Sequence, residues 1–176
     1  MGNPGHREPP PSEAPRLRVL VPHKAAGAII GKGGEVLKQV RLRTGCHVDV
    51  AAPPSQAASD ASDRLVLLSG SGRSQLQALR EVATIVSQAM LAMSLAAPPL
   101  KFLIPADATP LVVGNNGAGI REVIEHSGAN VIVATQTLGG PGASPHVQGT
   151  RIVSAHGTID CVVAAARIVL ERIYGS

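Results

Sequence analysis

The stretch GAIIGKGGEVLKQVRLRTGCHVDV, residues 27–50, decides the fold of this chain. Its tetrad GKGG, residues 31–34, separates two apolar segments that otherwise have helical spacing. Each glycine costs a helix interior about 0.5–1 kcal/mol relative to alanine, so the tetrad ends one helix and a second helix begins after it. The second helix carries apolar residues at spacings of three and four and ends before Gly45. Residues 46–50 then alternate in polarity, which is typical of a strand with one buried face.

The same pattern occurs twice in the chain. A shift of 83 residues places residues 17–50 over residues 100–133 with ten of 34 positions identical, and a shift of 87 aligns a second block that begins at Arg64 and Arg151. Each half therefore predicts strand, helix, break, helix, strand, loop, strand and helix. We expect first strands at 17–22 and 100–105, third strands at 64–70 and 151–157, and last helices at 72–93 and 158–173.

These repeats predict two domains. We expect a disordered, proline-rich tail over residues 1–16, a first domain over 17–95, a linker over 96–99 and a second domain over 100–174. The linker, AAPP, is short and stiffened by proline, so it should hold the two domains close together.

Composition excludes several classes of protein. Hydrophobic residues make up 44% of the chain, but Phe102 and Tyr174 are its only aromatic residues, which argues against RRM and OB folds because these stack bases on aromatic rings. The net charge of +4 suits a nucleic-acid-binding protein. Cys46, Cys161 and the six histidines show no metal-ligand spacing, so we expect buried thiols in a reducing compartment and no metal, cofactor or enzymatic activity. Without an apolar run of about 18 residues or an apolar N-terminal signal core, we expect a soluble protein of the nucleus or cytoplasm.

The tetrad itself predicts a phosphate-binding turn. Glycines expose the backbone N–H groups, the following helix presents its positive dipole end, and Lys32 adds a cation. A mononucleotide P-loop is excluded because Gly27 and Gly31 bracket three residues and Gly33 replaces the required hydroxyl. A dinucleotide fingerprint fails because the tetrad joins helix to helix. The remaining alternative is a tight helix–helix turn without a ligand, and the recurrence of the break at GNNG, residues 114–117, weighs against it.

At this point both halves resemble type I KH domains. The residues that carry the resemblance are residues 27–50 with RLVLLSG, and PLVVGNNGAGIREVIEHSGANVIV, residues 110–133, with RIVSAHG. The resemblance covers nearly all of residues 17–174, and the tandem is most similar to the poly(C)-binding and hnRNP K group. It implies an α+β fold in which each domain, ordered β-α-α-β-β-α, packs a three-stranded antiparallel sheet against three helices. It also implies a narrow groove for about four nucleotides of single-stranded RNA, clamped by the GxxG turn.

The resemblance assigns roles to residues at the matching positions. Phosphate contacts are expected from Gly31, Lys32, Gly33 and Gly34, and from Gly114, Asn115, Asn116 and Gly117. Gly27 stands at the groove entrance, and the apolar floor is expected from Ala28, Ile29, Leu37 and Val48, and from Leu111, Val112, Ile120 and Val131. Further contacts are expected from Lys38, Arg41, Asp49, Arg64, Arg121 and Arg151. We expect Ile30, Val40, Val113 and Val123 to belong to the core.

The two copies differ in charge. Residues 17–95 hold nine Lys and Arg against five acids, whereas residues 98–176 hold five of each. Since affinity that is independent of sequence follows the number of neutralised phosphates, we expect the first domain to supply most of the binding. Pro110 and Leu111 replace Gly27 and Ala28, which should narrow the second groove. Poly(C)-binding relatives commonly place a basic or amide side chain just after the small residue that opens the second strand. His47 and Asn130 occupy that position here and Asp49 follows, so we expect a preference that leans toward pyrimidines without strict C-richness.

Three functions fit these observations. The first is single-stranded RNA binding in RNA processing, stability or translation; the second is single-stranded DNA binding by a transcription cofactor. The third is a protein-interaction scaffold whose second KH domain no longer binds nucleic acid. In related tandems the first strands and last helices pack the domains together, so we expect residues 17–21, 100–104 and apolar parts of 76–95 and 162–173 at an interface between the domains.

Overall fold

The computed structural model describes residues 17–51, 63–141 and 145–175. The expected disordered tail over residues 1–16 and parts of both long loops lie outside the described residues. The first domain consists of β1 (Leu17–Pro22), α1 (His23–Ile30), the 3₁₀ turn η2 (Lys32–Gly34), α2 (Glu35–Thr44), β2 (His47–Val50), β3 (Asp63–Ser69) and α3 (Gly72–Ala92). Every element expected in this half is present within two residues of its expected bounds.

The second domain repeats this order with one difference. It consists of β4 (Leu100–Pro105), the 3₁₀ turn η3 (Ala106–Ala108), α4 (Thr109–Val113), the 3₁₀ turn η4 (Asn115–Gly117), α5 (Ala118–Ser127), β5 (Asn130–Val133), β6 (Thr150–His156) and α6 (Ile159–Tyr174). The helix expected before the second tetrad is split into η3 and α4. Pro110 explains the split, because proline has no N–H to donate to the carbonyl four residues earlier and its ring crowds that carbonyl.

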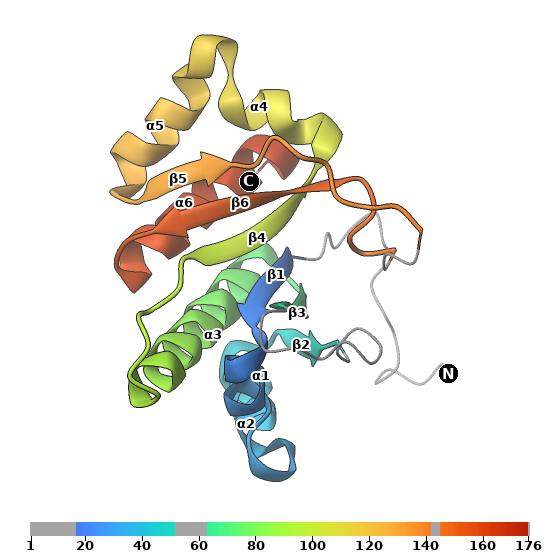
Figure 1. Cartoon of the computed structure of the whole chain (residues 1–176), viewed down its shortest axis with the longest axis vertical. Helices are drawn as coiled ribbons and strands as arrows, with labels where there is room; N and C mark the ends of the chain where they lie inside the picture. Colours follow the sequence, from blue (N-terminus) through green and yellow to red (C-terminus); the bar gives the residue numbers. More distant parts are fainter. Residues whose placement is uncertain (1–16, 52–62, 142–144, 176) are drawn as a thin grey trace.

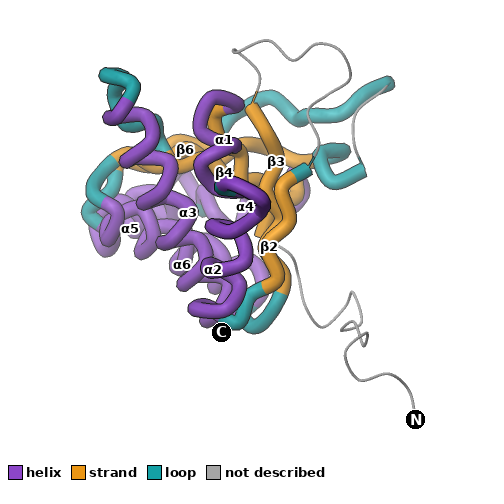
Figure 2. Tube along the Cα trace, turned by 90° about the horizontal axis from the view of Figure 1, so that it is seen from below, coloured by secondary structure: helices purple, strands orange, loops and turns teal. Residues whose placement is uncertain are grey.

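The strands form one antiparallel sheet across both domains (Figure 1), in the order β2-β3-β1-β4-β6-β5. The domains join where β1 pairs with β4 through three residue pairs, with Val19 opposite Phe102 at the centre. These two residues are equivalent under the 83-residue shift, so the domains are related by an approximate two-fold axis at this pair. Figure 2 shows the helices on one side of the strands, where α3 also contacts α6. The expected interface of first strands and last helices is confirmed.

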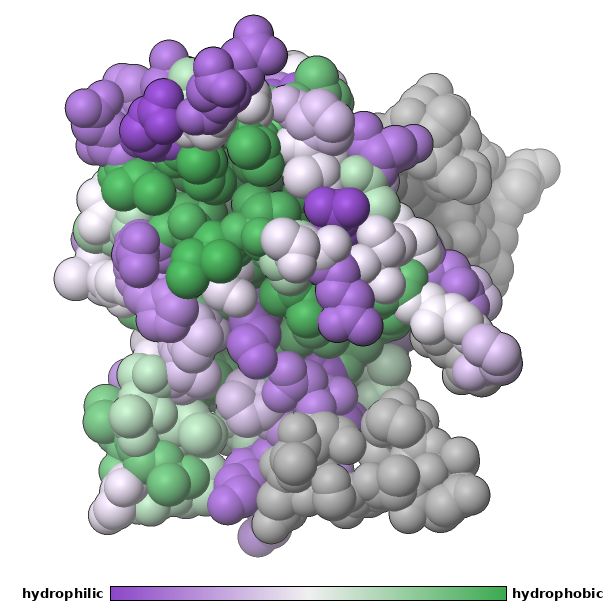
Figure 3. Space-filling model, turned by 45° about the horizontal axis from the view of Figure 1, so that its top comes forward, coloured by the Kyte–Doolittle hydropathy of each residue, from purple (hydrophilic) through white to green (hydrophobic). Residues whose placement is uncertain are grey.

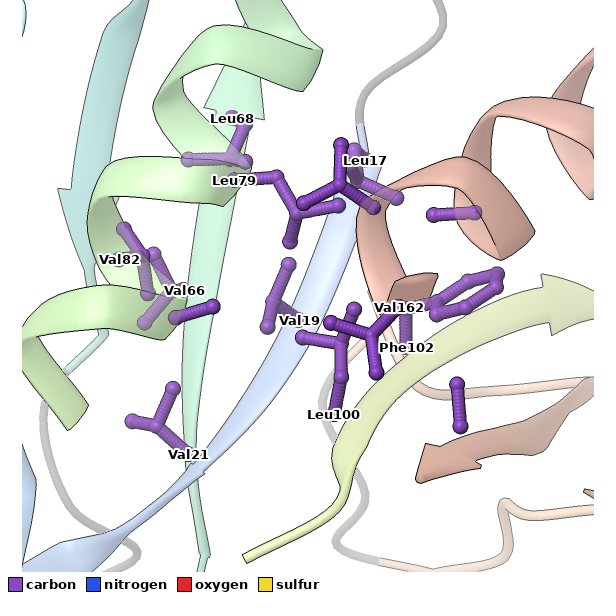
Figure 4. Close-up of a cluster of buried hydrophobic side chains, with 14 of the residues drawn as sticks. Leu17, Val19, Val21, Val66, Leu68, Leu79, Val82, Leu100, Phe102 and Val162 are labelled. Atoms are coloured by element: carbon purple, nitrogen blue, oxygen red, sulfur yellow. The ribbon is translucent and has the colours of Figure 1, made fainter. Parts of the chain in front are cut away.

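One aliphatic core runs through both domains on the helical side of the sheet (Figure 4). Alternate residues of β1 and β4 point into it, and Leu17, Val19 and Phe102 are at most 2% exposed. Because successive side chains of a strand point to opposite faces, these alternate apolar residues all lie on the face that the helices cover. In Figure 4, Phe102 lies beside Val162 of α6, so the core is continuous across the boundary between the domains.

The opposite face of the sheet carries a second, smaller apolar cluster. Leu65, Leu67 and Leu103 form its buried centre, and Leu138 and Val147 from the loop after β5 pack against it. Two polar contacts cross between the domains on this face: Arg18 Nη1 donates to the carbonyl of His146 at 2.9 Å, and Lys101 Nζ lies 3.4 Å from Asp63 Oδ2. Arg18 and Lys101 are equivalent in the repeat, so each domain sends one basic side chain toward the other. None of the described helices has the length and apolar character needed to cross a membrane.

Candidate nucleic-acid interface

The first GxxG turn has a backbone that only glycine adopts easily. Gly31, Gly33 and Gly34 have φ angles of 78°, 64° and 79°, in the left-handed region. A Cβ on Gly31 would lie 2.4 Å from Cγ2 of Val36, so the close approach of α1 to α2 also requires glycine there. Lys32 and Gly33 are exposed at the tip of the turn. The helix break expected from the tetrad is thus an ordered turn with a cation at its tip.

The second GxxG turn repeats this backbone without a cation at its tip. Gly114 and Gly117 have φ angles of 74° and 79°, and Asn116 adopts the left-handed conformation of its counterpart Gly33, with a φ of 53°. Arg121 Nη1 donates to the carbonyl of Asn116 at 2.9 Å, which places a guanidinium against the turn. Asparagine tolerates this conformation better than most residues, so the fold of the turn survives the change of sequence.

The helices at the second turn approach more closely than those at the first. A Cβ on Gly119 of α5 would lie 2.5 Å from the carbonyl oxygen of Val112 in α4, whereas the equivalent position in α2 is occupied by Val36. The second groove therefore differs from the first at its helical wall. The sequence shows Gly119 but not the contact that requires it.

The basic side chains near the first groove fall into two groups. Lys32 and Lys38 are exposed and make no hydrogen bond or ion pair within the described residues. Arg41 donates from Nε and Nη2 to the carbonyl of Val48, at 3.0 and 2.7 Å, and Arg64 donates from Nε to the carbonyl of Ala51 at 2.9 Å. The arginines are thus held against β2 and the residue after it, while the two lysines extend into solvent.

Arg41 and Arg64 converge on one side of this region. Val48 and Ala51, whose carbonyls accept from them, lie three residues apart on β2 and just after it. Asp49 lies between these acceptors and is exposed. Arg41, Asp49 and Arg64 therefore lie at β2 and the residue after it, whereas Lys38 lies exposed in the first half of α2. In the second domain Arg151 Nε contacts Thr137 Oγ1 at 3.2 Å, and Ile124 replaces Arg41.

The structure corrects the predicted apolar floor. Ile29, Val48 and Val112 are fully buried and Val131 is 4% exposed, so these four side chains belong to the core and cannot touch a ligand in this conformation. The reason is helical phase in α1, where Ala25, Ala26 and Ile29 face the sheet. On β2 and β5, Val48 and Val131 lie on the strand face that points toward the helices.

Their neighbours take the more accessible positions. Ile30 and Val113, which we assigned to the core, are only half-buried, so that assignment was wrong; Val40 and Val123 are fully buried as expected. Ala28, Leu37 and Ile120 are half-buried, and Leu111 is 55% exposed. Residues 25, 26 and 29 lie on one face of a helix, so the spacing from Ala25 and Ala26 already predicts that Ile29 is buried and that Ile30 is the more accessible residue.

The second domain presents an apolar surface where the first presents charge. Leu111 and Ile132 are more than half exposed, and Val113, Ile120 and Ile124 are half-buried. In Figure 3, with the top of the molecule turned forward, hydrophobic side chains form a continuous patch on the second-domain part of the surface. The shift of 83 residues aligns Asp49 with Ile132, so an apolar side chain replaces a carboxylate in the second domain. This difference is visible in the sequence but was not among the predicted site residues.

No group of three or more His, Cys, Asp or Glu side chains is placed to hold a metal ion within residues 17–51, 63–141 and 145–175. The two turns consist of backbone, flanking aliphatic side chains and, at the tip of the first turn, the cation of Lys32.

Comparison with known proteins identifies the family. The KH domain model matches residues 16–84 and 99–171, and the chain belongs to the KH domain family, with two KH domains in tandem. It is 25% identical over 173 residues to the human RNA-binding protein Nova-2, and the match covers 89% of this chain and 34% of that protein. The chain thus spans about a third of the length of this relative.

Solved structures give weaker matches. Dim2p from Pyrococcus horikoshii OT3 is 15% identical with a TM-score of 0.32, covering 92% of both chains. A complex of a/eIF2alpha, aDim2p and rRNA from the same organism matches at 16% identity and a TM-score of 0.32, covering 93% of this chain and 87% of that one.

Proposed function

We propose that this chain binds single-stranded RNA through its first KH groove and acts in post-transcriptional regulation, in the nucleus, the cytoplasm or both. The observation that carries the proposal is the left-handed GxxG turn with Lys32 exposed at its tip, in a domain that also presents the exposed Lys38 and holds Arg41 and Arg64 against β2 and the residue after it. A phosphate chain can approach the glycine backbone closely there, and cations surround its path. Membership of the KH family and the likeness to Nova-2 support the same function.

The base preference proposed here leans toward pyrimidines, as in the poly(C)-binding and hnRNP K group. Arg41 and Arg64 each use Nε on a backbone carbonyl, which fixes the guanidinium plane beside the groove. Asp49, exposed on β2, can accept a hydrogen bond from the amino group of a cytosine. The groove is lined by small and aliphatic side chains, which suits the smaller bases.

Two alternatives remain tied to particular observations. The groove does not itself distinguish RNA from single-stranded DNA. A role as a DNA-binding transcription cofactor therefore predicts that DNA octamers bind at least as tightly as the matched RNA octamers. The uncharged tip of the second turn and the apolar patch around Leu111 and Ile132 favour a protein-interaction scaffold for the second domain.

The test is a titration of fluorescein-labelled C-rich, U-rich, A-rich and G-rich octamers, as RNA and as DNA, followed by anisotropy. Lys32→Asp/Gly33→Asp should lower the affinity by at least about ten-fold, because it adds negative charge where the phosphates lie. Asn115→Asp/Asn116→Asp should lower it less than about three-fold. Asn116 already adopts the backbone of Gly33, so an Asp at position 33 is compatible with the turn.

The matched control is Gly72→Asp/Arg73→Asp. It changes the charge by the same amount at exposed, adjacent positions at the start of α3, where acidic residues suit the helix dipole. RNA affinity should be nearly unchanged in this variant. Equal losses of RNA affinity in the control and in the Lys32 variant would show that RNA binds by non-specific charge attraction. If the wild type bound no octamer at low salt, the RNA-binding proposal would be wrong and the scaffold function would be the one to test.

A further inference from the structure

A cleft of about 730 Å³ lies between the two domains, away from both GxxG turns. Its walls come from the first part of α3, one face of α6 and Leu17 of β1, so it exists only because the domains pack together. The volume lies in the range of sites that hold ligands or peptide segments. None of the residues predicted to contact RNA lines it.

The α6 wall is a continuous helical face. Val163, Arg167, Leu170 and Tyr174 follow one another at spacings of four, three and four, which places them on one side of the helix. Leu76 lines the opposite wall on α3, and Tyr174, the only tyrosine of the chain, is 47% exposed. Tyrosine and arginine are the residue types that most often dominate binding energy in protein interfaces.

The approximate two-fold axis shows which ion pair the cleft lacks. Arg80 of α3 and Asp160 of α6 both line the cleft, and they form an ion pair with each other. Under the 87-residue shift, Arg80 corresponds to Arg167 and Asp160 corresponds to Arg73. The counterpart of the ion pair is therefore two arginines, and both line the cleft. Arg167 instead lies 3.4 Å from Glu171 on its own helix, and Arg73 has no partner within the described residues.

The opposite end of the α3–α6 contact, beside the linker, shows which kind of chain segment fits against these helices. The linker residues Ala97, Pro98 and Pro99 run along that end, where only about 110 Å³ remains open beside Val82, Val86 and Ile159. These linker residues belong to neither a helix nor a strand. A short non-helical segment of apolar and proline residues thus packs at the position that corresponds to the cleft.

From these observations we propose that the cleft is an interaction site for a partner protein, which inserts a short, extended segment of apolar and proline residues flanked by carboxylates. The apolar part packs on Leu76, Leu170 and Tyr174, and a carboxylate joins Arg73 to Arg167 as Asp160 does for Arg80. Extended proline-containing segments commonly dock on grooves that present aromatic residues. Binding here leaves both GxxG turns free, so the chain can hold RNA and the partner together.

The experiment uses the full chain and a fluorescein-labelled peptide, Glu-Leu-Ala-Ala-Pro-Pro-Leu-Glu, which is the linker sequence flanked by glutamates. The matched control peptide carries lysines in place of the glutamates. We expect anisotropy to show binding of the acidic peptide at least ten-fold tighter than binding of the lysine peptide. Arg73→Asp should abolish peptide binding, because its carboxylate takes the place of the ligand and pairs with Arg167, and Tyr174→Ala should weaken it at least five-fold.

RNA binding by the same variants separates this site from the groove. Arg73→Asp should keep RNA affinity within three-fold, while Lys38→Asp, which makes the same charge change, should lower RNA affinity and leave peptide affinity unchanged. Arg73 is exposed, and thermal denaturation of Arg73→Asp should show a transition at least as high as that of the wild type.

Four results would overturn the proposal. Equal binding of the two peptides, or acidic-peptide binding that survives Arg73→Asp, would exclude recognition by the arginine pair. A loss of RNA affinity in Arg73→Asp as large as that in Lys38→Asp would make the cleft an RNA surface instead. Peptide binding that appears only after residues 1–16 are removed would show that the chain's own N-terminal segment occupies the cleft, rather than a partner.

Discussion

Lys32 and Asn115 occupy the same place in two turns with nearly the same backbone, and only one of them is charged. The comparison isolates a single variable, because Asn116 reproduces the left-handed conformation of Gly33 and the flanking glycines are identical. The two turns therefore differ in their two central residues, which are Lys32 and Gly33 in the first KH domain and Asn115 and Asn116 in the second.

Asn115→Lys/Asn116→Gly should therefore give the second domain a working cation. In the background of Lys32→Asp/Gly33→Asp, we expect RNA affinity at low salt to rise by about three- to ten-fold, since one more phosphate is neutralised. The measurement is an anisotropy titration at several salt concentrations, in which the salt dependence should steepen. Asn115→Gln/Asn116→Gly is the uncharged control. If the lysine variant gains nothing over it, the narrower α4–α5 wall limits the second groove instead of its charge.

Cys46 gives a prediction about pH. Its thiol is 2% exposed and contacts the carbonyl of Ser69 at 3.3 Å, and burial raises its pKa to about 11 from an ordinary value of 9.0. The folded state therefore keeps this proton to higher pH than the unfolded state, so stability is intact below about pH 9 and falls as the pH rises toward 11.

The measurement is the free energy of unfolding in urea from pH 7 to 10.5, for the wild type and for Cys46→Ala, which installs the residue of the equivalent position, Ala129. The wild type should lose up to about 2 kcal/mol more than Cys46→Ala over this range. Parallel pH profiles would show that the thiol ionises equally in both states.

At the scale of elements, glycines at two helical positions should respond in opposite ways to alanine. A Cβ added to Gly27 in α1 would have no neighbouring atom within 4 Å, and the backbone there is ordinary helix, so Gly27→Ala should raise stability by about 0.5–1 kcal/mol. Gly119→Ala should lower stability by about 1–3 kcal/mol, because its Cβ would lie 2.5 Å from the Val112 carbonyl. Urea denaturation of both variants provides the check, and a neutral Gly119→Ala would mean that α4 moves aside without cost.

The order of elements could be predicted because glycine, proline and apolar spacing act locally. Thr158 caps α6 by accepting from the N–H of Cys161, which explains why the helix begins one residue after the expected start. Burial at the site could not be predicted equally well. Whether Ile29 or Ile30 faces the sheet depends on the rotation of α1, and the close α4–α5 contact at Gly119 depends on two segments meeting in space.

At the scale of the whole molecule, the two domains share one sheet and one core. Sequence resemblance indicated which strands and helices would meet, but the register of β1 on β4 fixes the approximate two-fold axis at Val19 and Phe102, and no local pattern determines that register. The loop after β5 packs on the second cluster and receives Arg18 of the first domain, which adds a further connection. Such a shared core predicts that neither domain unfolds alone.

Phe102→Ala tests this coupling at the centre of the interface. Phe102 is fully buried, and its truncation should lower the free energy of unfolding by about 3–5 kcal/mol, because it removes apolar contacts and leaves a cavity.

Cys46 reports on the first domain and Cys161 on the second, so thiol labelling along a urea gradient follows each domain separately. In the wild type the labelling rates of the buried Cys46 and of the half-buried Cys161 should rise at one midpoint, and in Phe102→Ala both midpoints should fall together, because the lost packing supports both sides of the β1–β4 pair. Val123→Ala is the control, because Val123 is fully buried in α5 and does not belong to the β1–β4 pair. It removes packing from the helices of the second domain alone. If Phe102→Ala lowers only the Cys161 midpoint, the domains fold independently and the continuous sheet contributes little to stability.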